Sequence, residues 1–239
     1  MAGIVSVDGM RVDKPGTRFE SDIEVAVADD TCPYVSRGGL KLEKAIRVFG
    51  IDLEGVKAAD IGASTGGFTD CMLQKGAEHV WCIDVGYGQL DWKLRNDPRV
   101  TNLEKTNIRY LEPGSVDPEL DFISIDVSFI SLALVLPVAA GMLSEEGSLV
   151  CLVKPQFEAG REQVGKKGIV RDPQVHMQVI QKVIDCGKEC GLHAAGLDFS
   201  PVTGAKGNIE YILFMTRKLC DNDIDVEGTV EASHRELDR

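Results

Sequence analysis

The residues that could do chemistry in this chain stand at the ends of apolar segments. Asp60, Asp84 and Asp126 each end a short run of small or apolar residues, and Lys154 ends another. In an open α/β sheet, ligands bind beyond the carboxyl ends of the parallel strands. These four side chains are therefore expected at one edge of a sheet. There, carboxylates could bind hydroxyl and ammonium groups, and an amine could accept a proton.

A glycine-rich turn follows the first of these strands. It lies within residues 60–70, and its glycines at positions 62, 66 and 67 let a ligand approach the backbone and the start of a helix. Asp84, at the end of the next strand, is placed to accept hydrogen bonds from the two hydroxyls of a ribose. The pattern predicts a site for a nucleoside cofactor. The structural alternative is a turn that only joins a strand to a helix.

The glycine spacing distinguishes between two nucleoside cofactors. It departs from Gly-x-Gly-x-x-Gly, because Ala63 and Ser64 follow Gly62 and the next glycine is Gly66. A dinucleotide needs the helix N-terminus for its pyrophosphate. S-adenosylmethionine (SAM) carries no phosphate and needs a carboxylate, such as Asp60, near its ammonium group. We therefore expect SAM rather than NAD.

Lys154 follows the apolar run 149–153. Because lysine is rarely buried without a partner, this side chain is either an ion-pair partner of Asp126 or a catalytic group. Desolvation and a second nearby cation would lower its pKa and let it take a proton from a hydroxyl nucleophile.

The elements that must position these residues alternate along the chain. Strands are predicted near residues 57–61, 79–84, 99–103, 121–126, 148–153, 193–199 and 208–216, and helices near 36–49, 67–75, 89–95, 130–143 and 173–190. Such alternation predicts an α/β protein with a doubly wound parallel sheet. A loop at 201–207 joins the last two strands, which indicates a terminal antiparallel hairpin. This arrangement is typical of the Rossmann-like fold of SAM-dependent methyltransferases.

Four regions are expected from the change in pattern along the chain. Residues 1–28 contain short strands that cannot build a core alone, and we interpret them as a small partial β module. Residues 29–56 form a linker and a helix, and residues 57–217 form the methyltransferase domain. Residues 218–239 are rich in acidic side chains and are predicted to be a disordered tail.

Composition restricts the cellular setting. The formal net charge is −12, which disfavours nucleic acid as a partner of the chain as a whole, although basic residues gather within 154–172. No signal peptide or membrane-spanning run is visible. Seven cysteines are scattered, and the pair Cys186 and Cys190 lacks the second pair that a zinc site requires. We expect a protein of the reducing cytoplasm without a metal site or a membrane partner.

Six segments closely resemble the TlyA family. Members of this family are often labelled hemolysins but belong with the FtsJ-like ribosomal RNA 2′-O-methyltransferases. The resemblance extends over about residues 1–216 and is carried by the segments 36–42, 60–70, 84–90, 126–132, 153–158 and 207–211.

The resemblance implies roles for individual residues. The catalytic set of the family falls on Lys41, Asp126, Lys154 and Glu210. Lys154 would deprotonate or polarise a ribose 2′-hydroxyl, Asp126 and Lys41 would orient it, and Glu210 would position Lys154 or the ribose. By their local sequence alone, Lys41 is a solvated helix lysine and Glu210 an edge-strand acid.

The same resemblance implies the SAM contacts and the substrate. Asp84 would bind the ribose of SAM, and the turn at 106–107 would lie near its adenine. The full set expected to contact SAM is Asp60, Gly62, Ala63, Ser64, Gly66, Gly67, Phe68, Asp84, Val85, Thr106, Asn107 and Asp126. The substrate would be a cytidine of ribosomal RNA, free or in ribosomal subunits.

One departure from the family concerns the N-terminal region. Family members usually begin with a complete RNA-binding module in which two helices precede the strands, whereas residues 1–28 match only its second half. A truncated module would weaken RNA binding without affecting the cofactor site. Three alternatives to the enzyme remain at this stage: a non-catalytic ribosome-assembly or RNA-binding factor, a membrane-active hemolysin and an NAD-dependent oxidoreductase.

Overall fold

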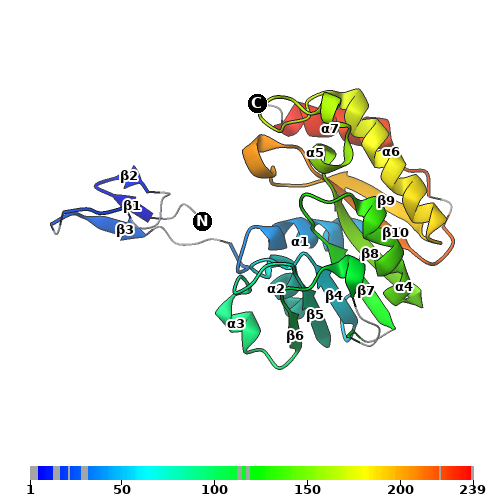
Figure 1. Cartoon of the computed structure of the whole chain (residues 1–239), viewed down its shortest axis with the longest axis horizontal. Helices are drawn as coiled ribbons and strands as arrows, with labels where there is room; N and C mark the ends of the chain where they lie inside the picture. Colours follow the sequence, from blue (N-terminus) through cyan, green and yellow to red (C-terminus); the bar gives the residue numbers. More distant parts are fainter. Residues whose placement is uncertain are drawn as a thin grey trace.

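The main body of the protein is a seven-stranded sheet with helices on both faces (Figure 1). The computed structural model describes residues 5–12, 17–20, 22–27, 32–111, 115–116, 119–220 and 222–237. The sheet order is β6-β5-β4-β7-β8-β10-β9. The strands are β4 (Lys57–Ile61), β5 (His79–Ile83), β6 (Val100–Leu103), β7 (Leu120–Ile125), β8 (Leu143–Val153), β9 (His193–Phe199) and β10 (Tyr211–Thr216). The predicted α/β fold class is confirmed.

Helices connect the strands as the alternating pattern predicts. The α-helices are α1 (Gly38–Phe49), α2 (Gly67–Gln74), α3 (Trp92–Arg95), α4 (Leu136–Met142), α5 (Pro155–Glu158), α6 (Pro173–Glu189) and α7 (Val226–Leu237). The described part of the chain also contains the short 3-10 helices Ile108–Tyr110, Leu132–Leu134, Arg161–Gln163 and Ala205–Gly207. The helix expected over 130–143 is divided into a 3-10 turn and α4, which begins with Pro137 in its first turn, a position where the missing amide hydrogen costs nothing.

The antiparallel hairpin at the end of the sheet is confirmed. Its position in the sheet brings Glu210 to the same edge as Lys154. β10 pairs antiparallel with both β8 and β9, so it lies between them. The register pairs Tyr211 with Val153. Glu210 precedes one of these residues and Lys154 follows the other. An antiparallel strand thereby brings a residue at its beginning to the same edge as residues at the ends of the parallel strands.

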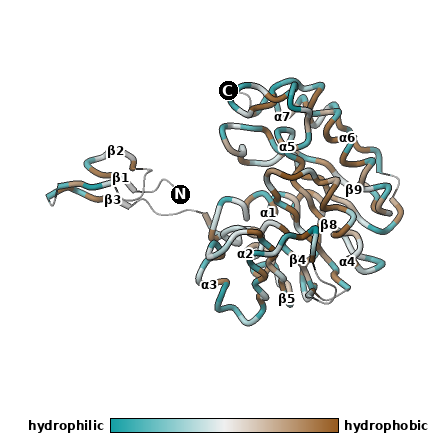
Figure 2. Tube along the Cα trace, viewed as in Figure 1, coloured by the Kyte–Doolittle hydropathy of each residue, from teal (hydrophilic) through white to brown (hydrophobic). Residues whose placement is uncertain are grey.

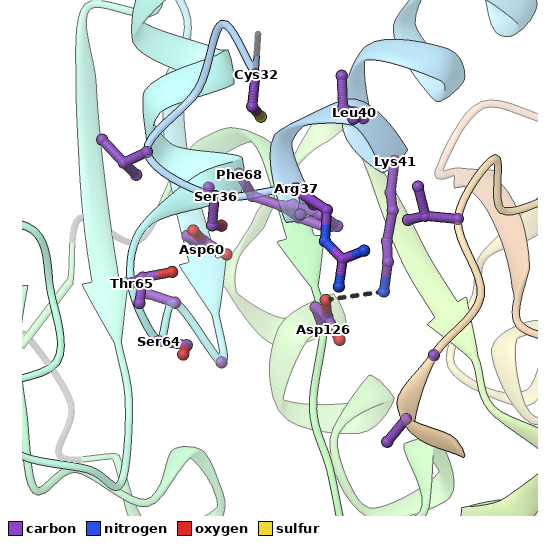
Figure 3. A pocket seen from close by; sticks show the side chains of 18 of the residues that line it. Cys32, Ser36, Arg37, Leu40, Lys41, Asp60, Ser64, Thr65, Phe68 and Asp126 are labelled. Carbon is purple, nitrogen blue, oxygen red and sulfur yellow. Dashed lines mark ion pairs between the residues drawn. The ribbon is translucent and has the colours of Figure 1, made fainter. Parts of the chain in front are cut away.

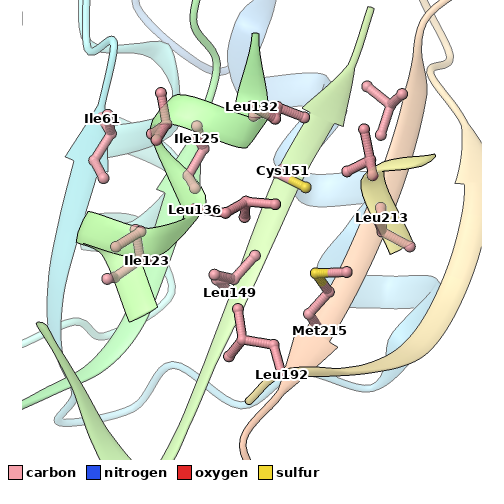
Figure 4. Packing of buried hydrophobic residues seen from close by; sticks show 14 of the residues in the cluster. Ile61, Ile123, Ile125, Leu132, Leu136, Leu149, Cys151, Leu192, Leu213 and Met215 are labelled. Carbon is pink, nitrogen blue, oxygen red and sulfur yellow. The ribbon is translucent and has the colours of Figure 1, made fainter. Parts of the chain in front are cut away.

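Side chains alternate between the two faces of the sheet and form a hydrophobic core on each. Ile123, Leu149 and Leu213 belong to the cluster beneath α4, α6 and α7 (Figure 4), whereas their neighbours Phe122 and Val150 belong to the cluster beneath α1 and α2. Hydrophobic residues accordingly concentrate along the central strands (Figure 2). A parallel sheet covered on both faces requires such continuous apolar runs.

The predicted disordered acidic tail is wrong for residues 226–237. They form α7, which lies beside α6 (Figure 1). Val226, Val230, Ser233 and Leu237 recur at helical spacing on one face, where Val230 and Ser233 are fully buried. The prediction from net charge overlooked this apolar face, because the acidic residues occupy the other positions of the helix.

Three short strands form a second, antiparallel sheet. They are β1 (Val5–Val7), β2 (Met10–Arg11) and β3 (Val25–Val27), in the order β2-β1-β3. They correspond to the strands expected within 1–28, while the expected boundary at 28–29 lies outside the described residues. Across the described ranges, no helix is long and apolar enough to cross a membrane.

Candidate active site

The glycine-rich turn brings the ends of β4 and β7 into close contact. Gly62 has a positive φ of 86°, and a Cβ atom at this position would overlap the carbonyl oxygen of Asp126. Its amide donates a hydrogen bond to the carbonyl oxygen of Ile83 at 2.8 Å. A side chain here would displace the backbone of Asp126, so this position requires glycine.

Asp60 is buried beneath the turn and joins β4 to α2. One carboxylate oxygen accepts hydrogen bonds from the amide of Thr69 at 3.0 Å and from its hydroxyl at 2.7 Å. The other accepts from the hydroxyl of Ser124 at 3.2 Å. Burial raises the pKa of Asp60 to about 7, the charge of Asp126 adds to this rise, and the hydrogen bonds oppose it. The carboxylate thus holds the start of α2 in place below the cavity.

Asp84 fixes the glycine-rich turn from the end of β5. Its carboxylate accepts hydrogen bonds from the amide of Ser64 at 2.8 Å and from the amide of Gly86 at 2.6 Å. Ser64 itself has a positive φ of 49°, a conformation that is uncommon for residues other than glycine. Asp84 therefore stabilises the unusual backbone of the turn on which a ligand would rest.

A cavity of about 930 Å³ opens above this turn (Figure 3). The expected SAM contacts that line it are Asp60, Gly62, Ala63, Ser64, Gly67, Phe68 and Asp126. The expected contacts that do not line it are Gly66, Asp84, Val85, Thr106 and Asn107. In this second group, the Asn107 side chain accepts a hydrogen bond from the amide of Arg109 at 3.1 Å, so it caps a short 3-10 helix.

Four charged side chains meet at one side of this cavity. The Nζ atom of Lys41 is 2.7 Å from the Glu210 carboxylate and 3.7 Å from that of Asp126. Lys154 forms an ion pair with the other oxygen of Asp126. The exposed fractions of the side chains are 4% for Glu210, 8% for Lys154, 11% for Lys41 and 22% for Asp126. Two cations and two carboxylates form a neutral, largely desolvated cluster, and the four residues expected to be catalytic are brought together.

Neighbouring residues hold this cluster in place. Lys154 donates a hydrogen bond to the Ser128 hydroxyl at 3.3 Å, and Gln156 donates to the Glu210 carboxylate at 3.4 Å. Burial lowers the pKa of Lys41, but the charges of Asp126 and Glu210 and their hydrogen bonds outweigh it, so the pKa lies above its ordinary value. Lys41 is consequently a fixed cation within the cluster.

Several residues at the site were not expected from the sequence. Arg37, directly before α1, extends towards Asp126 (Figure 3), and the loop 202–206 lines another wall of the cavity. Arg37, Ser128 and Gln156 lie within the segments that resemble a known family, and this resemblance could have identified them as residues of the site. The loop carries no periodic pattern that could have identified it.

The residues at the cavity fit SAM. The volume lies within the roughly 300–1,000 Å³ of small-molecule sites. The glycine positions leave the backbone of the turn open to a ligand, and Asp60 and Asp126 supply carboxylates at the wall. Across the described residues, no group of three or more His, Cys, Asp or Glu side chains is arranged to hold a metal ion.

Comparison with known proteins assigns the chain to a family. The family model described as FtsJ-like methyltransferase matches residues 34–217. The 16S/23S rRNA (cytidine-2′-O)-methyltransferase TlyA of Mycobacterium tuberculosis is 44% identical over 99% of this chain and 88% of the relative. Hemolysin A of Brachyspira hyodysenteriae is 41% identical over 89% of this chain and 88% of the relative.

A solved structure agrees with this assignment. A Streptococcus thermophilus protein named as a hemolysin is 46% identical, with a TM-score of 0.85, and the match covers 100% of this chain and 88% of that one. A Listeria monocytogenes protein named as a SAM-dependent methyltransferase shares only the fold, at 15% identity and a TM-score of 0.57. The chain belongs to the FtsJ-like methyltransferase family, in its TlyA group, an enzyme class that uses SAM as methyl donor.

Proposed function

We propose that the protein methylates the ribose 2′-hydroxyl of cytidines in ribosomal RNA. The neutral cluster of Lys41, Asp126, Lys154 and Glu210 beside the glycine-rich cavity is the observation that supports this reaction. Relatives at 44% and 32% identity are named 16S/23S and 23S rRNA (cytidine-2′-O)-methyltransferases. A ribose hydroxyl is a weak nucleophile at neutral pH, so its reaction requires a positioned amine or cation.

Lys154 is the residue that acts on the hydroxyl. Its Nζ atom is held between Asp126 and Ser128. As an ammonium group it polarises the 2′-hydroxyl, and as the neutral amine, after it has lost its own proton, it accepts the hydroxyl proton. Lys41 stays protonated because its pKa is raised, and it stabilises negative charge that develops on the oxygen. Glu210 keeps Lys41 in position, and Asp126 contacts both lysines.

SAM supplies, when bound, a methyl group on a positively charged sulfur. The residues proposed to hold it are Gly62, Ala63, Ser64, Gly67 and Phe68, which line the cavity, with Asp84 as acceptor for its ribose hydroxyls. Both oxygens of Asp84 already accept one backbone amide each. A carboxylate oxygen can accept a second hydrogen bond, so these contacts are compatible with ribose binding.

Two alternatives make different predictions. A non-catalytic RNA-binding factor would have no need for a desolvated cluster of two lysines and two carboxylates, because burial of four charges is costly without a function. A membrane-active role is suggested by the name of the Brachyspira relative. No helix in the described part of the chain is apolar enough to span a membrane.

Transfer of labelled methyl groups from SAM tests the proposal. The protein is incubated with under-methylated ribosomal subunits and, separately, with their free RNA. Wild type is expected to label one of these substrates, and Lys154→Met is expected to bind SAM but lose at least 100-fold in rate, the order of a lost general acid–base group. Lys188→Ala removes an exposed lysine near the opposite end of the sheet and serves as the control. Equal rates for Lys154→Met and wild type would refute the catalytic assignment.

A further inference from the structure

Lys206 lines the cavity, and two further lysines lie on a neighbouring turn; none of the three forms an ion pair with a described carboxylate. These residues, Lys166, Lys167 and Lys206, are called the rim lysines, and all three are exposed. None of them forms an ion pair with another described residue, whereas Lys41, Lys44 and Lys154 each pair with a carboxylate. These cations, which lack an ion pair among the described residues, lie on two adjoining loops of a chain with a formal net charge of −12, so they are a local exception to its overall charge.

A tight turn presents two of the rim lysines side by side. The amide of Gly168 donates a hydrogen bond to the carbonyl of Gly165 at 2.8 Å, and the amide of Gly165 donates to the carbonyl of Ile169 at 3.0 Å. Lys166 and Lys167 occupy the two central positions of this turn. Their side chains therefore extend into solvent from its tip.

The buried side chain of Asn208 joins this turn to the loop that carries the third lysine. Its amide group donates to the carbonyls of Gly168 and Ala205, both at 3.0 Å, and its oxygen accepts from the amide of Val170 at 3.3 Å. The Nζ atom of Lys206 lies close to Gly168. The three ammonium groups are thus held on two loops that are fixed to each other.

The backbone of Lys206 is in a conformation that favours glycine. Its φ is 59° and its ψ is 16°, and the following Gly207 also has a positive φ. Lys206 lines the cavity in which Asp126 and Lys41 lie. Glycine at this position would remove the backbone strain but also the ammonium group, so the two contributions of Lys206 can be tested separately.

We propose that the rim lysines bind phosphate groups of the RNA on either side of the target nucleotide. This inference rests on the proposed function, because the RNA must place one ribose at Lys154 while its backbone crosses the rim. Phosphate contacts position an RNA without reading its sequence, and clustered lysines without carboxylates provide the complementary charge. SAM carries no phosphate, so its binding is expected not to depend on the rim lysines.

Binding of fluorescein-labelled oligocytidylate, followed by anisotropy over a series of salt concentrations, tests the inference. The variants are Lys206→Gly and Lys166→Ala/Lys167→Ala, with Lys188→Ala as a control for net charge. Each rim lysine removed is expected to reduce the slope of log K against log salt by about 0.7, the value for one phosphate contact of a single strand. Lys188→Ala is expected to leave the slope unchanged, and the Kd for SAM is expected to be equal in all variants.

Lys206→Gly distinguishes a role of the side chain in RNA binding from a role in the stability of the fold. Because glycine adopts a positive φ without strain, the thermal midpoint of this variant is expected to equal or exceed that of wild type, while its KM for RNA rises severalfold.

A salt slope equal to that of wild type in both variants would overturn the inference and leave the proposed function intact. A weakened affinity for SAM would overturn it as well, since the lysines would then belong to the cofactor site. If wild type transferred no methyl group, the proposed function would fail, and the anisotropy measurement would still decide whether the rim lysines bind phosphate.

Discussion

Removal of one charge from the neutral cluster is expected to destabilise the fold strongly. Lys41→Met leaves the Glu210 carboxylate, which is 4% exposed, with only the 3.4 Å contact from Gln156. Breaking a buried ion pair by removing one partner costs about 3–5 kcal/mol. Since Lys41 is itself 11% exposed, we expect a loss near the lower end, about 3 kcal/mol in the free energy of unfolding.

The paired substitution distinguishes a buried charge from lost packing. Lys41→Met/Glu210→Gln restores neutrality, because Asp126 keeps its pairing with Lys154. We expect the double variant to recover at least about 2 kcal/mol of the loss, since replacing both charges of a buried pair is often nearly neutral. Urea denaturation of the four proteins of this cycle measures the coupling, and SAM-dependent methyl transfer is expected to remain lost in the double variant. Additive effects of the two single substitutions would refute the interpretation of the cluster as a charge-balanced, desolvated unit.

Three further predictions concern the fold around the site. Gly62→Ala should reduce the free energy of unfolding by about 3 kcal/mol or more, because this position combines a positive φ with a clash against Asp126. Gly50 has a positive φ and no clash, so Gly50→Ala should cost only about 1 kcal/mol. Equal losses in urea denaturation would contradict the clash. Because the pKa of Asp60 is raised in the folded state, its carboxyl group is protonated in the folded protein but ionised in the unfolded protein between about pH 4 and 7. The free energy of unfolding should therefore fall as pH rises through this window, by up to about 1.4 kcal/mol per unit, and Asp60→Asn should flatten this dependence in pH-resolved denaturation. Val230→Asp places a charge in the core beneath α7 and should cost at least about 3 kcal/mol, and an unchanged thermal midpoint would contradict the packing of this helix.

The fold was largely predictable because most of its strands are apolar segments of the sequence that end in a charged residue. The runs that end at Asp60, Asp84 and Asp126 correspond to β4, β5 and β7. α7 was missed because a count of acidic residues does not reveal the apolar face that contains Val230. Helical periodicity in that segment was the signal that could have identified it.

The site was only partly predictable from local pattern. Lys154 stood out because it ends a buried strand, whereas Glu210 precedes an antiparallel strand and reaches the site through the register of β10 with β8. Lys41 lies on α1, and its contact with Glu210 joins residues 169 positions apart. Non-local pairings of this kind leave no local trace in the sequence, so both residues were expected from family resemblance alone.

Nucleoside analysis of the methylated RNA tests the central claim most directly. Under-methylated ribosomal subunits are incubated with SAM and the protein, and the RNA is digested to nucleosides and separated with mass detection. The proposed reaction predicts 2′-O-methylcytidine with wild type and none with Lys154→Met, although both proteins bind SAM. A methyl group on a base, or the same yield of 2′-O-methylcytidine from Lys154→Met, would contradict the assignment of the cluster to ribose methylation.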